Sequence, residues 1–96
     1  MKLKELFGPN GENWTKRTGA RDINGYSTTL DNPLAVSFCL VAGLTKYYLN
    51  NYIVWQSVRV YINKIKKNPY SLSISCWNDN EAEWKDIREL IETLDL

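Results

Sequence analysis

The chain has 96 residues, of which 44% are hydrophobic and 24% are charged. This length predicts one globular domain over residues 1–96, and the composition excludes an intrinsically disordered chain. The sequence contains no histidine. That absence excludes Ser-His and Cys-His nucleophiles, histidine general bases and nearly every common zinc or iron site. We therefore expect a protein that is not an enzyme and that uses no cofactor and no metal.

Nothing in the sequence predicts contact with a membrane. No apolar run reaches the roughly 18 residues that cross a bilayer, and the first residues lack the apolar stretch of a signal peptide. We expect a cytoplasmic protein. Cys39 lies in an apolar helical pattern and Cys76 in an alternating strand pattern, so both are expected to be buried free thiols.

The first third of the chain predicts a short helix and a β-hairpin. Apolar side chains recur at helical spacing over residues 2–7, and four turn formers at residues 8–11 end this helix. Strand-forming side chains at residues 14–20 and 26–29 flank residues 22–25. The Asn-Gly pair of that connection favours a type I′ turn between two strands.

The middle of the chain predicts two helices. Asp31 and Asn32 can cap a helix and Pro33 suits its first turn, so we expect a helix over residues 33–48. A second helix is expected over residues 53–67, where apolar residues again recur with helical period. The expected inner faces are Val36, Leu40, Leu44 and Tyr47 in the first helix, and Val54, Val58, Tyr61, Ile62 and Ile65 in the second.

The last third predicts one further strand and a final helix. Residues 71–76 alternate small polar with apolar side chains, which favours a half-buried strand paired with the hairpin. Residues 78–80 offer caps for the helix that follows. Its expected inner face is Trp84, Ile87, Leu90, Ile91 and Leu94. The predicted fold class is therefore α+β: a β-hairpin plus one further strand packed on two central helices and a C-terminal helix.

The charge is unevenly distributed although the net charge is only +1. Residues 32–78 contain five cations and no carboxylate, whereas residues 79–96 contain seven carboxylates and two cations, a balance of −5. We expect the basic helix to pair partly with the acidic final helix. Presentation of those carboxylates to a basic partner is an alternative, which the near-neutral total disfavours.

A nucleic-acid surface is another interpretation of the basic stretch. Arg59, Lys64, Lys66 and Lys67 lie near several aromatic rings, and cations with rings are what single-stranded nucleic acids contact. The footprint of these charges is small for a dedicated binder. Nucleic acid is therefore kept as the alternative partner.

Two short polar motifs stand at predicted strand ends, Arg21-Asp22 near the front and Trp77-Asn78-Asp79 before the final helix. We expect them to meet. In a structural interpretation Arg21 pairs with a carboxylate, Asn78 or Asp79 caps the final helix, and Trp77 covers the core. In the other interpretation these five residues bind a ligand or protein partner. Catalysis by Arg21, Asp22 and Asp79 would require their convergence in a pocket.

These motifs also carry a resemblance. The pieces, in chain order, are Trp14, Gly19-Ala20-Arg21-Asp22, Gly25, Pro33, Cys39-Leu40, Ile74, Trp77-Asn78-Asp79 and Asp86-Ile87. In that order the sequence resembles an uncharacterised family of small bacterial and phage proteins, a domain of unknown function, over residues 14–94. The resemblance implies a bacterial or phage setting and brings no activity with it.

The sequence thus leads to an interaction protein as the expected class. We expect a small module, a phage or mobile-element accessory protein, that binds a host protein in the bacterial cytoplasm. Such a module should expose aromatic surface, for instance from Tyr48, Tyr52 or Trp55. The identity of the partner and the oligomeric state do not follow from the sequence.

Overall fold

The computed structural model of the chain describes residues 2–96. Its elements, in chain order, are α1 (Lys2–Phe7), β1 (Ala20–Asp22), β2 (Ser27–Thr28), β3 (Ala35–Phe38), α2 (Leu40–Tyr48), α3 (Tyr52–Lys64), the 3-10 helix η1 (Pro69–Ser71), α4 (Ile74–Asn80) and α5 (Trp84–Leu94). The α+β class is confirmed. Met1, the first residue of the expected domain, lies outside the described residues. Within them, every helix is too short or too polar to cross a membrane.

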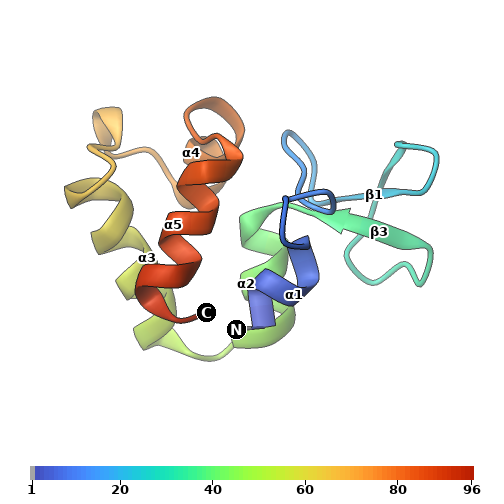
Figure 1. The fold of residues 1–96 in the computed structure, drawn as a ribbon, viewed down its shortest axis with the longest axis horizontal. Helices are drawn as coiled ribbons and strands as arrows, with labels where there is room; N and C mark the ends of the chain where they lie inside the picture. Colours follow the sequence, from blue (N-terminus) through green and yellow to red (C-terminus); the bar gives the residue numbers. More distant parts are fainter. Residues whose placement is uncertain (1) are drawn as a thin grey trace.

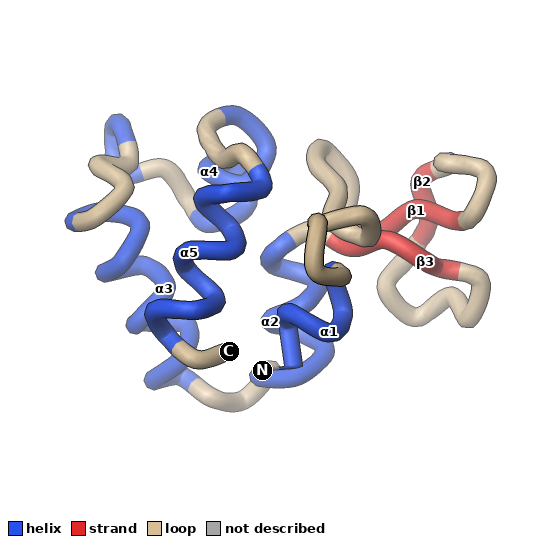
Figure 2. Tube along the Cα trace, viewed as in Figure 1, coloured by secondary structure: helices blue, strands red, loops and turns tan. Residues whose placement is uncertain are grey.

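The helices form one body, and the sheet projects from its side, next to α1 and α2 (Figure 1). The strands are grouped at one end of the long axis (Figure 2), and the molecule measures 36 × 24 × 23 Å. The two ends of the described chain lie side by side, since the amide of Leu3 donates to the carbonyl of Leu96 at 3.0 Å. The acidic α5 packs against α3 and α1.

The sheet has the order β2-β1-β3, and both pairs are antiparallel. The predicted hairpin is confirmed as the β1-β2 pair. Its second strand is shorter than expected, and its first strand overlaps the predicted residues 14–20 only at Ala20 and extends to Asp22, which was expected in the turn. The Asp22 carboxylate accepts from the amides of Asn24 and Tyr26 at 2.9 and 3.1 Å, and Gly25 supplies a positive φ of 84°. Asp22 therefore shapes the turn, as such residues do when their side chains replace a backbone partner.

The prediction of one helix over residues 33–48 is wrong in its first third. Residues 35–38 form β3, which pairs with β1, and the helix begins only at Leu40. Asn32 does cap locally, because its side chain accepts from the amide of Leu34 at 2.9 Å, but it caps a turn. The β-branched and aromatic side chains of Val36 and Phe38 suit a strand, and pairing with β1, whose paired residues lie 13 to 18 positions earlier in the chain, decides the outcome.

The prediction of a strand over residues 71–76 is also wrong. Ser73 is the N-cap of α4, and its hydroxyl accepts from the amide of Cys76 at 3.2 Å. Ile74 and Trp77 then bury one helical face, while Cys76 is exposed rather than buried. The third strand of the sheet is β3, so the expected hairpin with one further strand is reached with a different segment. The sheet lies beside α1 and α2 at one end of the molecule, and not on two central helices and the C-terminal helix as expected.

The remaining helices are confirmed with small shifts in their ends, and they share one core. The fully buried large side chains come from all five α-helices: Leu3, Phe7, Leu40, Leu44, Val58, Ile62, Trp77, Ile87, Leu90 and Ile91. Three residues expected on inner faces are exposed instead. Val36 lies on β3, Tyr47 is the last residue but one of α2, and Ile65 lies just beyond the end of α3.

Candidate functional site

Arg21 on β1 holds the loop that precedes the sheet. Its guanidinium donates to the hydroxyl of Thr15 at 2.8 Å, to the carbonyl of Lys16 at 3.0 Å and to the carbonyl of Gly25 at 3.1 Å. Within residues 2–96 it forms no ion pair, so the expected pairing with a carboxylate is wrong. The reason is local, because the Thr15 hydroxyl and the carbonyls of Lys16 and Gly25 accept its hydrogen bonds.

Asn78 is the polar centre of the molecule. The residue is completely buried, and its carboxamide oxygen accepts from the indole N–H of Trp14 at 2.8 Å and from the amide of Leu40 at 3.1 Å. Its amide nitrogen donates to the carbonyl of Thr15 at 3.2 Å and to the carboxylate of Asp79 at 3.0 Å. Asn78 therefore joins α4 to the front loop and to the start of α2.

The cap expected from Asn78 exists, but on another helix. Leu40 is the first residue of α2, so its amide is one of the unpaired donors of that helix. Cys39 assists as the N-cap, because its sulfur accepts from the amide of Ala42 at 3.3 Å. Burial raises the pKa of the Cys39 thiol, which makes it a poor nucleophile at neutral pH.

The final helix is capped by other residues than those expected. Glu83 is the N-cap of α5, and it forms a capping box with Asp86. Asp79 instead accepts from the amide of Arg17 at 2.8 Å, where the chain adopts a left-handed φ of 67°. Asp79 thereby holds a backbone conformation that is costly for a residue other than glycine.

The two polar motifs thus meet through a third segment. Arg21 binds Thr15 and Lys16, while Asn78 and Asp79 bind Thr15 and Arg17. Trp77 beside them is 2% exposed and covers the core, as expected. These contacts are those of a structural brace. Ligand or partner binding by the five motif residues stays a prediction.

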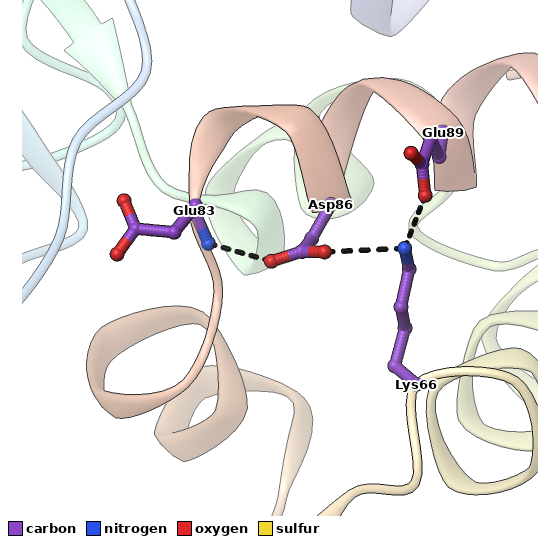
Figure 3. Close-up of polar contacts among 4 residues, drawn as sticks. All are labelled: Lys66, Glu83, Asp86 and Glu89. Atoms are coloured by element: carbon purple, nitrogen blue, oxygen red, sulfur yellow. Dashed lines mark hydrogen bonds and ion pairs between the residues drawn. The ribbon is translucent and has the colours of Figure 1, made fainter.

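The basic and acidic parts of the chain meet at Lys66 (Figure 3). Its ammonium pairs with the carboxylate of Asp86 at 3.1 Å and with that of Glu89, while the other Asp86 oxygen accepts from the amide of Glu83 at 2.9 Å. The expected pairing between these two parts is confirmed here. Because Lys66 is paired with these carboxylates, its charge is not free to contact a nucleic-acid phosphate.

Lys66, Asp86 and Glu89 shift one another's pKa values. Burial alone would raise the pKa of Asp86, but the Glu83 amide and the Lys66 ammonium together outweigh it and lower that pKa. The hydrogen bond to Lys66 lowers the pKa of Glu89. Burial alone would lower the pKa of Lys66, but its two carboxylates raise it.

Sequence reasoning did not single out a groove along the outer side of α3. It has a volume of about 470 Å³, and apolar side chains dominate its walls. The lining residues are Tyr52, Ile53, Gln56, Ser57, Val60, Tyr61, Lys64 and Ile65 from α3 and its C-terminal end, with Leu94 from α5. We call this the α3 groove. Three of its apolar side chains are largely exposed: Tyr52 is 74%, Ile53 75% and Ile65 63% exposed.

A second hollow of about 340 Å³ adjoins the α3 groove and shares Tyr52 and Gln56 with it. Trp55 and Arg59 line its far side. Of the three rings expected to be exposed, Tyr52 is exposed, whereas Tyr48 and Trp55 are half-buried. The Trp55 indole N–H donates a hydrogen bond to the Tyr48 carbonyl at 2.8 Å. The second apolar face had a sequence signal, because Ile53 and Val60 repeat two turns apart on the side opposite Val58 and Ile62.

Ligand-type side chains do not gather into a metal site: within residues 2–96, no three Cys, Asp or Glu side chains lie together in a suitable group. Comparison with known proteins gives no match to any family model, any curated protein or any solved structure. The α3 groove is accordingly assessed on its own geometry.

Replacing Asn78 by alanine tests the polar centre. The change leaves the Trp14 indole, the Leu40 amide and the Thr15 carbonyl without their buried partner, so we expect the free energy of unfolding to fall by about 2–4 kcal/mol. Urea unfolding followed by tryptophan fluorescence measures the loss. Asn80→Ala, at the exposed end of the same helix, is the control. A loss equal to that of the control would contradict the role of Asn78.

The Lys66 cluster predicts a dependence of stability on pH. Asp86 and Glu89 have lower pKa values folded than unfolded, so their stabilisation is present above their unfolded pKa values, near 4, and is lost as the pH falls through the folded values. In Lys66→Met both pKa values move back toward normal. The variant should therefore lose less stability than the wild type between about pH 5 and pH 2.

Urea titrations at several pH values check this difference. Lys67→Met, which removes an exposed cation that forms no ion pair within residues 2–96, should follow the wild-type curve. Parallel curves for Lys66→Met and the wild type would show that the cluster does not shift these carboxylates.

Proposed function

We propose that this chain is a small, non-enzymatic protein-interaction module and that the α3 groove is its binding face. The observation that carries the proposal is the exposure of Tyr52, Ile53 and Ile65 along one side of α3, where they line a groove together. Single exposed apolar residues are ordinary on protein surfaces, but contiguous ones mark interaction sites.

The pattern of α3 supports the same conclusion. Its inner face places Val58 and Ile62 in the core, and its outer face presents Ile53 and Val60 to solvent. A helix that is apolar on opposite sides is typical of a helix that is covered on both. Burying an exposed isoleucine or valine side chain contributes about 1.5–3 kcal/mol, so covering the groove would stabilise a complex substantially.

The setting that we propose is the bacterial cytoplasm, or the host cytoplasm for a phage-encoded protein. The resemblance of the sequence to a family of small bacterial and phage proteins supports this setting. The partner would then be a host protein, and the module would act by occupying a surface of that partner.

Nucleic acid is the weaker alternative. Of Arg59, Lys64, Lys66 and Lys67, the structure pairs Lys66 with two carboxylates, and Lys64 is the one of these four cations that lines the groove. Binding to single strands requires several free cations along a track with rings for stacking. A gel mobility shift with single-stranded DNA and RNA at low salt tests this alternative directly.

Val60→Glu is the variant that tests the proposed binding face. It places a charge in the groove while leaving the core unchanged, because Val60 is 43% exposed. In affinity capture from cells that encode the protein, followed by reconstitution with the purified partner, the wild type should bind a partner at fixed stoichiometry. We expect Val60→Glu to weaken that binding by at least about tenfold, since burying a carboxylate against the apolar side chains of a partner costs more than about 1.4 kcal/mol.

Ile23→Glu is the matched control. It makes the same kind of change at an 83% exposed isoleucine in the hairpin turn, far along the chain from α3, and should bind as the wild type does. Equal binding by wild type and Val60→Glu would place the partner elsewhere. A partner that is nucleic acid, displaced by Lys64→Glu together with Arg59→Glu, would replace the proposed function with its alternative.

A further inference from the structure

The charged side chains that line the α3 groove and the adjoining hollow are cations. Lys64 lines the groove and Arg59 lines the adjoining hollow, and both are exposed. Neither forms an ion pair within residues 2–96. The whole segment from residue 32 to residue 78 contains no carboxylate that could neutralise them.

The carboxylates of α5 are directed to other cations. Asp86 and Glu89 pair with Lys66, and Glu92 pairs with Lys4 at 3.6 Å. Asp95 is the C-cap of α5 and lies near Tyr48. Burial raises the pKa of Tyr48, and the Asp95 carboxylate raises it further. The three carboxylates within α5 therefore leave Lys64 and Arg59 without an ion pair in residues 2–96.

The walls of the groove also limit the conformation of what can cover it. The groove is lined by α3 and its C-terminal end together with Leu94 of α5, and the interior backbone groups of α3 are hydrogen-bonded within that helix. The groove therefore presents side chains and no free backbone edge. The Ser57 hydroxyl already donates to the Ile53 carbonyl at 2.8 Å. An extended segment buried there would lose water from its own N–H and C=O groups without gaining partners, whereas a helix pairs these groups internally.

The length of the groove fits a short helix. It runs from Tyr52 to Ile65, which at 1.5 Å per residue corresponds to about 20 Å. A helix of about 14 residues covers that length, with apolar side chains at i, i+4, i+7 and i+11 as anchors.

We infer that the occupant of the α3 groove is an amphipathic helix of a partner protein, with acidic side chains flanking its apolar stripe so that they face Lys64 and Arg59. This inference rests on the proposed function and specifies its partner. The apolar stripe supplies affinity, and the carboxylates fix direction and register, since complementary charge at an interface mainly confers specificity and a faster association.

A displayed library of helical peptides tests the inference. Each 16-residue peptide carries leucine at i, i+4, i+7 and i+11, and its other positions vary among polar, acidic and basic residues. The protein is immobilised through the exposed Cys76 thiol, which lies outside the groove, because Cys39 is buried. Selection on the wild type, with Val60→Glu as the counter-target, should enrich helices with an excess of Asp and Glu.

Fluorescence anisotropy with one enriched peptide then measures the charge contribution. Reversal of both cations, Arg59→Glu with Lys64→Glu, should raise Kd at least about tenfold, and added salt should weaken wild-type binding. Lys85→Glu with Arg88→Glu makes the same net change on α5 outside the groove and should leave Kd within about twofold. Exchanging the acids of the peptide for lysines should restore binding to the double-reversal variant.

Several outcomes would overturn the inference. Enrichment of neutral or basic helices, or a Kd unchanged by the double reversal while Val60→Glu abolishes binding, would refute the acidic partner and leave the proposed function intact. Peptides insensitive to Val60→Glu, or no enrichment over that counter-target, would refute both. Light scattering that shows a dimer of this chain, dissociated by Val60→Glu, would make a second copy the occupant.

Discussion

One buried carboxamide connects the parts of this molecule. Asn78 lies inside α4, yet its hydrogen bonds reach the Trp14 ring, the Thr15 carbonyl and the first amide of α2. A buried polar group is costly unless its partners are all present, so these segments must be correctly placed together. Arg21 holds the same loop from the sheet side through Thr15 and Lys16. The projecting sheet is thereby attached to the helical body by polar contacts as well as by packing.

One face of α3 remains exposed to solvent. Its inner side packs on α2, α4 and α5, and Lys66 beyond its end is fixed to Asp86 and Glu89. These ion pairs neutralise one cation of the basic segment with carboxylates of the acidic helix. The outer side of α3 keeps its apolar side chains and the positive charge of Lys64. A surface of that kind is suited to a helical partner of opposite charge. Stability and recognition therefore use different sides of the same helix.

The sequence predicts correctly those elements that depend on contacts between residues close together in the chain, and it fails for β3, where residues distant in the chain decide the structure. Residues 2–7 and 84–94 fold as predicted because their helices follow the local apolar periodicity. Residues 35–38 and 74–80 were mispredicted for different reasons. The former become a strand only because β1 lies beside them, while Ser73 capping was obscured by an alternating pattern that also suits a strand. The two polar motifs both bind the loop at residues 15–17, through the Thr15 hydroxyl and backbone groups, and this loop has no sequence pattern of its own.

Native-state hydrogen exchange tests most directly whether Asn78 unites the fold. The account predicts that the Trp14 indole N–H, the Leu40 amide and the Cys39 amide, which donates to Gly19 beside the sheet, exchange only through global unfolding. Their exchange free energies should equal that of Leu90, a core residue of α5. Fast exchange of these three groups while Leu90 stays protected would contradict it, because the sheet and front loop would then open independently of the helices.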